Sequence, residues 1–262
     1  MSDAAAATFT GERPGRGEHF DYDEARHLAA YVYAARLAAG KRVVDAGCGE
    51  GWGTQLLASV AADVVGLDYS AEAIAACRRL WQAPNLRFLQ FDLTGSRPLG
   101  ERFDLVTNFQ VVEHMRDPLP FLHGLRGLLA PGGQLLLTTP NRLKTFSENP
   151  YHVREYTAAE LAALLHAVFA DVTMLGMHGN AKVTAFDQRR EQAVKQILRL
   201  DPLGLRKLLP APVVHFAFAR LAVLVRRRAH AAAPPERIVP EDFHISGEDI
   251  SSAVDLVALC AG

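Results

Sequence analysis

The stretch Val43-Val44-Asp45-Ala46-Gly47-Cys48-Gly49-Glu50-Gly51-Trp52-Gly53 predicts the fold of this chain. It starts with β-branched residues that suit the end of a buried strand, continues with glycines at alternate positions, and leads into a helical run that begins at Thr54. A strand, a glycine turn and a helix in this order bring backbone N–H groups up to a nucleotide-like ligand. Glycine permits the positive φ angles of such a turn and the close approach of the ligand. A turn with a purely structural role can show the same glycine pattern. The flanking sequence therefore has to distinguish a ligand-binding turn from a structural one.

An acidic residue, Asp68, ends the next apolar stretch, Val64-Val65-Gly66-Leu67, about twenty residues after the glycine turn. A carboxylate at the end of this second strand can accept hydrogen bonds from both hydroxyls of a ribose. Asp68 could instead cap the helix that follows, although Ser70 suits this role better. We therefore expect Asp68 to contact a ribose.

Two further strands are predicted at 86–91 and 103–109. The first is followed by Asp92 and Leu93, an acid beside an apolar residue, where an adenine could sit. Since the carboxyl ends of parallel strands meet at one edge of a sheet, and open α/β sheets bind their ligands there, these residues and Asp68 are expected to face one ligand.

The rest of the chain predicts a doubly wound α/β fold with a mostly parallel, seven-stranded sheet. Strand and helix patterns alternate over 43–140, which indicates right-handed parallel connections. A sixth strand is predicted at 171–175. Residues 241–245 and 253–259 are typical of the last strands, and the latter is expected to complete the sheet as its seventh, antiparallel strand.

The ordered motifs of the chain resemble those of the class I S-adenosylmethionine-dependent methyltransferases. A nicotinamide dehydrogenase would share only the glycine turn and the acid of the second strand. The resemblance covers roughly residues 10–175 and implies a Rossmann-like fold and S-adenosylmethionine as cofactor. The motifs that carry it, in chain order, are Val43–Gly53, Gly66-Leu67-Asp68, Phe91-Asp92-Leu93, Val111-Val112-Glu113-His114-Met115 and Leu129-Ala130-Pro131-Gly132-Gly133-Gln134-Leu135.

The same resemblance implies which residues hold the cofactor. It places the methionine part at Asp45, Gly47 and Gly49, the ribose at Asp68, the adenine at Asp92 and Leu93, and the methionine amino group and the floor of the site at Asn108 and Gln110, with Trp52 and Tyr69 completing the set. The cofactor carries the reactive methyl group, and the protein supplies alignment and electrostatics.

Two histidines are candidates for the general base that a hydroxyl acceptor would need. His114 and His152 each lie in a motif at the ligand edge, and imidazole suits proton transfer near neutral pH. Glu113 or Glu155 could orient an imidazole or act in its place. Glu113, Asp117 and Glu155 could also supply oxygen ligands, but nothing in their spacing demands a metal, so no metal site is predicted.

Several segments also resemble a narrower branch of sugar O-methyltransferases associated with polysaccharides and glycolipids. The matching segments are Thr10–Arg13, His27–Tyr31, Thr139–Arg142, Asn149–Glu155 and the C-terminal pattern from Asp242 to Ala258. This branch implies a sugar hydroxyl of a glycan, oligosaccharide or glycolipid as acceptor. The alternatives are a small-molecule O- or N-methyltransferase acting on a phenol, a quinone precursor or a natural product, and a non-catalytic cofactor-binding module.

The chain divides into a core and two additions. Residues 1–40 are expected to form an N-terminal helical lid over the cofactor, and 41–184 with 236–262 to form the core. Residues 185–235 are expected to be a basic, amphipathic helical insertion, because ten Lys or Arg stand against two acids within 189–228. Such a segment can lie in a membrane interface, or it can pack over the active site as a cap.

Composition narrows the function classes. The net charge of −1 gives no electrostatic case for nucleic acid, and no Asn-Pro-Pro-Tyr-type motif follows the fourth strand. The three widely spaced cysteines suggest a reducing cytoplasm, and the first residues do not resemble a signal peptide. The oligomeric state cannot be read from the sequence.

Overall fold

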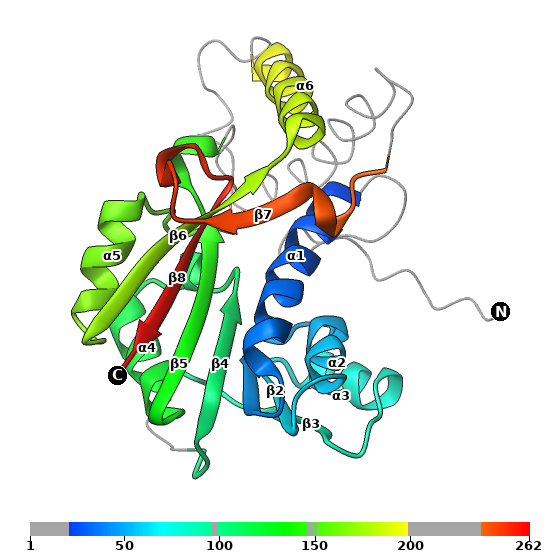
Figure 1. Ribbon diagram of the computed structural model, residues 1–262, viewed down its shortest axis with the longest axis vertical. Coiled ribbons are helices and arrows are strands. Elements are labelled where there is room, and N and C mark those ends of the chain that lie inside the picture. Colours follow the sequence, from blue (N-terminus) through cyan, green and yellow to red (C-terminus); the bar gives the residue numbers. More distant parts are fainter. Residues whose placement is uncertain (1–20, 96–98, 146–148, 150, 199–236) are drawn as a thin grey trace, which may run out of the picture.

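The computed structural model describes residues 21–95, 99–145, 149, 151–198 and 237–262, which form a twisted sheet with helices on both faces (Figure 1). The sheet has eight strands in the order β3-β2-β1-β4-β5-β8-β6-β7. They are β1 (Arg42–Ala46), β2 (Asp63–Asp68), β3 (Leu86–Gln90), β4 (Phe103–Phe109), β5 (Leu129–Pro140), β6 (Asp171–Gly179), β7 (Phe243–Ser246) and β8 (Asp255–Ala261).

The parallel half of the sheet confirms the predicted α/β fold. Strand β1 lies between β2 and β4, with Val44 beside Val65 on one side and Val106 on the other, and every pairing from β3 to β5 is parallel. These side chains are fully buried, as expected for strands covered on both faces. The carboxyl ends of β1, β2 and β4 therefore meet at one edge of the sheet.

The prediction of seven strands was wrong by one. Strand β8 lies between β5 and β6 and is antiparallel to both, as expected for the last strand. The additional strand is β7, whose four residues pair antiparallel with Gly176–Gly179 at the edge of the sheet. Both C-terminal segments thus join the sheet.

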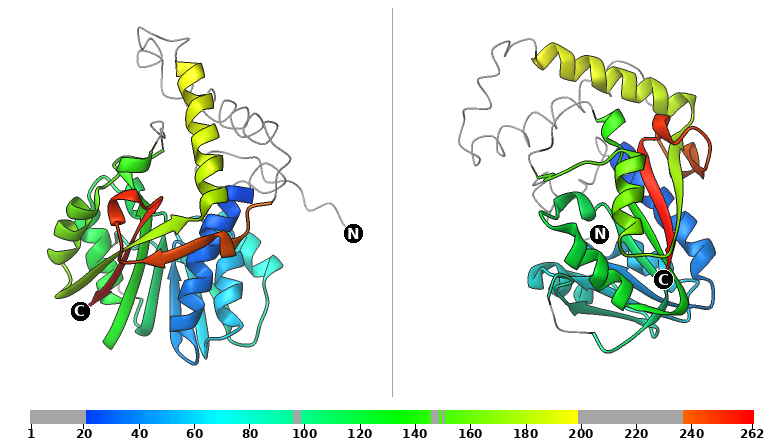
Figure 2. Two further views of the ribbon diagram at one scale, coloured as in Figure 1. Left: turned by 45° about the horizontal axis from the view of Figure 1, so that its top comes forward. Right: turned by 90° about the vertical axis from the view of Figure 1, so that its left-hand side faces the viewer.

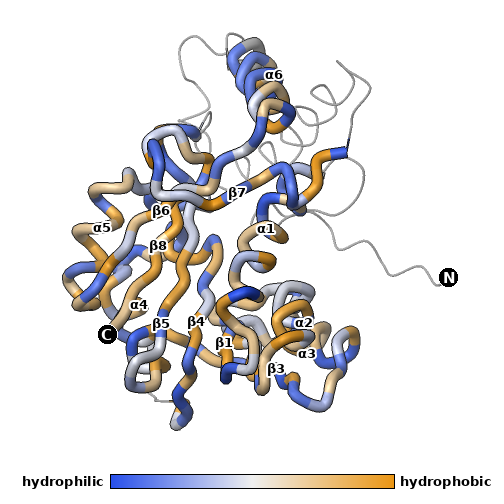
Figure 3. The backbone as a smooth tube through the Cα atoms, viewed as in Figure 1, coloured by the Kyte–Doolittle hydropathy of each residue, from blue (hydrophilic) through white to orange (hydrophobic). Residues whose placement is uncertain are grey.

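Helices cover both faces of the sheet, as the two further views show (Figure 2). Side chains of α4 and α5 pack on one face, and those of α1 and α2 pack on the other, with α3 beside β3. Figure 3 shows hydrophobic residues concentrated in the central strands. The helices are α1 (Asp21–Ala38), α2 (Trp52–Ala58), α3 (Ala71–Leu80), α4 (Pro118–Gly127), α5 (Ala158–His166) and α6 (Ala181–Leu198).

Helix α6 extends away from the sheet (Figures 1 and 2). It begins at Ala181, four residues before the expected start of the insertion, and the rest of that insertion lies outside the described residues. The proposed membrane contact through 189–228 and the motif Thr10–Arg13 also fall mainly or wholly outside them. Among the helices that the structure describes, none combines the length and the apolar character needed to cross a bilayer.

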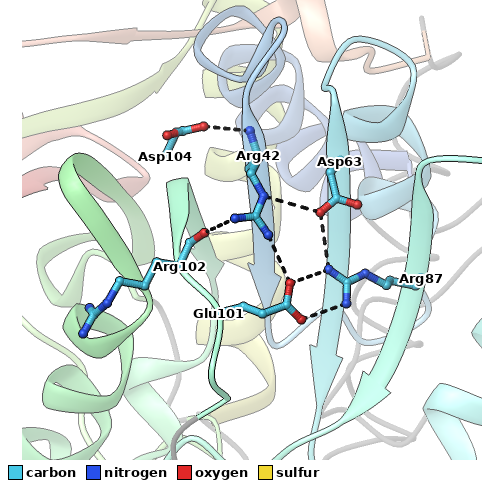
Figure 4. Close-up of polar contacts among 6 residues, drawn as sticks. All are labelled: Arg42, Asp63, Arg87, Glu101, Arg102 and Asp104. Atoms are coloured by element: carbon cyan, nitrogen blue, oxygen red, sulfur yellow. Dashed lines mark hydrogen bonds and ion pairs between the residues drawn. The ribbon is translucent and has the colours of Figure 1, made fainter.

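An ion-pair network joins the amino ends of three strands, at the edge opposite the cofactor turn (Figure 4). Glu101 accepts two hydrogen bonds from the Arg87 guanidinium, at 2.7 and 2.8 Å, and lies 3.1 Å from Arg42 Nη2. Asp63 lies 3.3 Å from Arg87 and 3.8 Å from Arg42. Because these side chains are partly exposed, the network is a modest contribution to strand register and has no contact with the ligand edge.

Candidate active site

A cavity of about 400 Å³ opens at the carboxyl ends of β1, β2, β3 and β4. Its size lies within the range of small-molecule sites. Its walls come from the glycine turn after β1, from the residues that follow the other three strands, and from helix α1. Of the residues predicted to bind the cofactor, the cavity wall contains Gly47, Gly49, Trp52, Asp68, Tyr69, Asp92, Leu93 and Gln110.

The glycine turn is tied directly to the predicted ribose-binding acid. Gly47 adopts a φ of +89°, and a Cβ there would lie 2.6 Å from Cγ2 of Val111, so only glycine fits. The N–H of Gly49 donates to Asp68 Oδ2 at 3.0 Å. The turn and the end of β2 therefore form one rigid corner of the cavity.

Asp68 lies on the cavity wall at the end of β2. Its Oδ1 accepts a hydrogen bond from the N–H of Ser70 at 2.9 Å. The cap of α3 is Ser70, whose Oγ accepts from the N–H of Ala73 at 3.2 Å, as the sequence favoured. Each carboxylate oxygen of Asp68 thus has one backbone donor and a further lone pair available, which fits the two hydroxyls of a ribose.

The end of β3 forms a mixed polar and apolar wall. Asp92 Oδ1 accepts hydrogen bonds from the Thr94 hydroxyl at 2.7 Å and the Thr94 N–H at 2.9 Å, and these bonds lower the pKa of Asp92. Leu93 lines the cavity together with Phe91 and Phe121. An ionised acid beside apolar side chains fits an adenine, which has polar edges and apolar faces.

Asp45, which the resemblance assigns to the methionine part, is buried and is not among the residues that line the cavity. Its side chain is 1% exposed and accepts hydrogen bonds from the Thr54 hydroxyl at 2.7 Å, the Thr107 hydroxyl at 2.9 Å and the Tyr31 hydroxyl at 3.1 Å. Burial raises the pKa of Asp45, and the three donors oppose this rise. Asp45 therefore anchors Tyr31, which belongs to α1 and does line the cavity.

Helix α1 contributes cavity residues that the motifs alone did not assign to the cofactor. The Tyr31 ring packs edge-on against Trp52 and Phe109, with ring centroids 5.2 and 4.8 Å apart. His27 also lines the cavity. The motif around His27 and Tyr31, from which an N-terminal lid was predicted, was the available signal for these contacts.

Two residues after β4 differ in their position. Asn108 is fully buried, donates to the Ala46 carbonyl at 2.7 Å and does not line the cavity, so its side chain holds β4 to β1. Gln110 does line the cavity and has a φ of +57°, which is unusual for a residue other than glycine. Such backbone conformations cluster at functional sites, and the sequence gives no signal for this one.

The four predicted catalytic residues come together from two segments. Glu113 and His114 lie in a short 3₁₀ turn, Val112–His114, and the N–H groups of Val153 and Arg154 donate to the Glu113 carbonyl at 2.8 and 3.1 Å. Of the four, only His114 lines the cavity. Its ring lies edge-on to that of His152, with centroids 5.1 Å apart.

Hydrogen bonds orient both histidines. His114 Nδ1 is 2.8 Å from the carbonyl oxygen of Tyr151, and His152 Nδ1 is 2.6 Å from Glu155 Oε1. Burial opposes ionisation of Glu155, but the bonds from His152 and Thr145 outweigh it and lower the pKa of Glu155.

Glu113 is fully buried next to these rings. Its Oε2 accepts a hydrogen bond from the Thr139 hydroxyl at 2.9 Å, whereas Oε1 has no hydrogen-bond partner among the described residues. Burial raises the pKa of Glu113 to about 7. The carboxyl group therefore exchanges its proton in the same pH range as an imidazole.

A buried ion pair on the far side of Gln110 was not predicted. Arg26 of α1 lies 3.4 Å from Asp255 of β8, and the Gln110 side chain also contacts this carboxyl group. Both partners are distant from Gln110 in the sequence, so no local pattern could reveal the contact.

Comparisons with known proteins agree with this geometry. The family described as "Methyltransferase domain" matches residues 18–171. A probable S-adenosylmethionine-dependent methyltransferase of Mycolicibacterium smegmatis is 39% identical over 195 residues, which cover 71% of this chain and 74% of that protein.

Of two more distant proteins, one is similar in sequence to part of the chain and the other is similar in fold. The ubiquinone biosynthesis O-methyltransferase of Cereibacter sphaeroides is 41% identical over 106 residues, covering 39% of this chain and 42% of that protein. The crystal structure of the [4+2]-cyclase SpnF aligns with a TM-score of 0.56 at 19% identity, covering 90% of this chain and 81% of that one. This last similarity concerns the fold alone.

Proposed function

We propose that this chain, which belongs to the methyltransferase domain family and is an S-adenosylmethionine-dependent methyltransferase, methylates a hydroxyl oxygen of its acceptor. The cofactor supplies the sulfonium methyl group when it is bound. The residues present fit it, because Gly47 leaves space that a Cβ would fill and Asp68 retains free lone pairs toward the cavity. We assign the ribose to Asp68, the adenine to Asp92 and Leu93, and the methionine part to the glycine turn and Gln110.

The observation that carries the proposal is the fixed tautomer of His114. A carbonyl oxygen can only accept a hydrogen bond, so the 2.8 Å contact with Tyr151 requires the proton of a neutral His114 to sit on Nδ1. Nε2 is then the basic nitrogen, on a side chain that lines the cavity. His114 accepts the proton of the acceptor hydroxyl as the hydroxyl oxygen attacks the methyl carbon.

A sugar hydroxyl is the first acceptor we propose. The part of the site around His114 is polar, with Gln110 on the wall, the partly buried His152 beside His114, and the buried acids Glu113 and Asp255 nearby. Amide, carboxylate and imidazole groups are suited to hydrogen bonding with a polyhydroxylated ligand. The resemblance of Thr139–Arg142 and Asn149–Glu155 to the sugar-methylating branch supports the same acceptor.

A phenol or quinone precursor is the second candidate. It is favoured by the partial relative named as a ubiquinone biosynthesis O-methyltransferase and by the aromatic side chains Tyr31, Trp52 and Phe109 on the cavity wall. A phenol needs less help to lose its proton than an alcohol, so this acceptor would depend less on His114.

A methyl-transfer screen with radiolabelled S-adenosylmethionine tests the proposal. Oligosaccharides and glycolipids are compared with phenols, quinone precursors and amines, using wild type and His114→Ala. The expected result is label on a sugar hydroxyl, with turnover reduced about 10²–10⁴-fold in His114→Ala. Label on a phenol alone would replace the sugar by the second candidate, and label on amines alone would refute hydroxyl methylation.

A further inference from the structure

We propose that Glu113, His114 and His152 form a binding site for one divalent transition-metal ion at the wall of the cavity. One carboxylate oxygen of Glu113 and one ring nitrogen of each histidine lie within 4.8 Å of one another. Ligand atoms about 2.1 Å from a tetrahedral ion are about 3.4 Å apart, so a pair separated by the full 4.8 Å has to approach by about 1.4 Å when the ion binds. Rotations of the two partly buried histidine side chains supply this movement.

The hydrogen bonds of the two histidines match those of metal ligands. A metal-binding histidine commonly donates its second ring N–H to a carboxylate or a backbone carbonyl. His152 Nδ1 is 2.6 Å from the carboxylate of Glu155, and His114 Nδ1 is 2.8 Å from the Tyr151 carbonyl. Both contacts leave Nε2 as the coordinating nitrogen and fix the plane of each ring.

The second ring nitrogen of His152 is not free in the structure described here. Its Nε2 is 2.9 Å from the side-chain amide nitrogen of Asn149. A bound ion would take the place of this donor, while Asn149 Oδ1 would keep its hydrogen bond from the N–H of Tyr151 at 3.1 Å. Ion binding therefore costs one hydrogen bond and leaves the rest of the turn in place.

The surroundings of Glu113 are a second, independent observation that supports a cation site. Its side chain is fully buried, and Oε1 has no hydrogen-bond partner in the described part of the chain. Buried carboxylates are normally paired with a donor, a cation or a metal ion. The backbone bonds from Val153 and Arg154 to the Glu113 carbonyl hold this residue against the segment that carries His152. The Glu113 carboxyl group, with its unpartnered oxygen, is thus held close to both histidine rings.

The ligand set selects the class of ion. Imidazole suits zinc, iron, nickel and copper, whereas magnesium and calcium prefer sites made of oxygen ligands. Two imidazoles and one carboxylate leave at least one coordination position open, as in catalytic zinc sites. We therefore use Zn²⁺ for titration and Co²⁺ as its spectroscopic probe.

The position of the metal site on the cavity wall suggests that the ion activates the acceptor hydroxyl, an inference that rests on the proposed function. His114 belongs to the cavity wall, so an open coordination position there can take the acceptor hydroxyl. The ion lowers the pKa of that hydroxyl, as it does for a bound water. The proton is released to solvent, the oxygen forms a bond to the methyl carbon, and the bond from that carbon to sulfur breaks to give the neutral thioether. In the metal-loaded protein, His114 is a ligand and the ion replaces it in activating the hydroxyl.

The test is calorimetric titration of the untagged, metal-free full chain with Zn²⁺. Wild type is expected to bind one equivalent, and His114→Ala, His152→Ala and Glu113→Gln to lose at least about tenfold in affinity. The matched control is His123→Ala, because His123 is an exposed histidine of α4 away from the site. Equal affinity in the site variants and the control, or no stoichiometric binding by wild type, would overturn the proposal.

Two further readouts keep the test decisive. Thermal unfolding and S-adenosylmethionine binding show whether each variant is folded. If an alanine variant fails to fold, Glu155→Gln takes its place. This variant removes only the carboxylate that contacts His152 and should weaken Zn²⁺ binding about tenfold. Co²⁺ bound at the site should give the absorption of nitrogen and oxygen coordination, and thiolate charge-transfer bands would place the ion at a cysteine and refute the site.

The outcome is separable from that of the proposed function. Zn²⁺ binding that depends on the three ligands supports the site even when no hydroxyl acceptor is methylated, which would overturn only the proposed function. Conversely, hydroxyl methylation by a protein that binds no Zn²⁺ would support the proposed function and overturn the metal site.

Discussion

Replacing Gly53 by alanine should destabilise the protein, although alanine is normally the better helix former. Gly53 lies in the first turn of α2, and a Cβ added there would be 2.1 Å from Cζ of Tyr31 and 2.2–2.4 Å from its neighbouring ring carbons. Carbon atoms in contact are about 3.5 Å apart, so the ring would have to retreat by about 1.4 Å. That movement would break the 3.1 Å hydrogen bond from the Tyr31 hydroxyl to Asp45.

The expected magnitude follows from three contributions. Overpacking costs about 1–3 kcal/mol, the loss of a hydrogen bond to a buried carboxyl group costs about 1–3 kcal/mol, and the helix propensity of alanine returns at most about 1 kcal/mol. The free energy of unfolding should therefore fall by about 1–5 kcal/mol. Because Tyr31 and Trp52 line the cavity, affinity for S-adenosylmethionine should fall as well.

Urea denaturation of Gly53→Ala, Gly127→Ala, Tyr31→Ala and the double variant Tyr31→Ala/Gly53→Ala measures this effect. Gly127→Ala in α4 is the matched control, since no atom lies within 4 Å of its added Cβ, and its stability should change by no more than about 1 kcal/mol. In a Tyr31→Ala background the clash is absent, so Gly53→Ala should cost little there, and the coupling energy should be nearly as large as the cost in wild type, about 1–5 kcal/mol. If Gly53→Ala is as stable as wild type, or if its cost is the same in both backgrounds, the packing of Tyr31 on α2 is refuted.

Three further predictions follow from other parts of the structure. Asp68→Ala should weaken S-adenosylmethionine binding at least about tenfold by calorimetry, and an unchanged affinity would refute its assignment to the ribose. Burial raises the pKa of Glu113 from 4.5 to about 7. Between these two pH values the native state holds a proton on Glu113 that the unfolded state has lost. The free energy of unfolding should therefore fall as pH rises from about 4.5 to about 7, by on the order of 2–3 kcal/mol. Urea titrations with a chelator present should show this fall in wild type and a flatter profile in Glu113→Gln, and parallel profiles would contradict it. In the partly exposed network at the amino ends of the strands, Glu101→Ala should lower the free energy of unfolding by no more than about 1 kcal/mol and leave cofactor affinity unchanged. A fall of more than about 3 kcal/mol would show that the network stabilises the fold more than its exposure predicts.

The sequence predicted the fold and the ligand edge because both depend on local patterns. Apolar strands that end in Asp68 or Asp92 need no knowledge of distant residues, since parallel strands bring their ends to one edge. A strand was expected at 241–245, where β7 lies, but the count of seven did not include it in the sheet, because its pairing with β6 is a long-range contact.

The direction of individual side chains was harder to predict. Asp45 belongs to the family motif, yet it is buried and does not line the cavity, and Thr54, Thr107 and Tyr31 bond to it from three different elements. Asn108 is likewise turned toward the Ala46 carbonyl. Motif position identifies the neighbourhood of a residue, but tertiary hydrogen bonds decide whether it meets the ligand.

The grouping of the catalytic candidates was predicted only in part. His114 and His152 were each expected at the ligand edge, and their rings do lie together. Glu155 was one of two acids expected to orient an imidazole, and it does contact His152 Nδ1. Nothing in the sequence indicated that the carbonyl of Tyr151 would contact His114 Nδ1, or that Glu113 would be buried with one oxygen unpartnered. The contact of His114 with Tyr151 joins segments almost forty residues apart.

The central claim, methyl transfer to a hydroxyl oxygen beside His114, is tested most directly with S-adenosylmethionine carrying a ¹³C-labelled methyl group. The NMR shift of the product methyl group, together with its long-range coupling, identifies the atom that receives it. The account predicts an O-methyl signal coupled to a ring carbon of a sugar, at a rate that falls about 10²–10⁴-fold in His114→Ala. A methyl group on nitrogen or carbon, or an O-methyl product formed equally fast by His114→Ala, would contradict it.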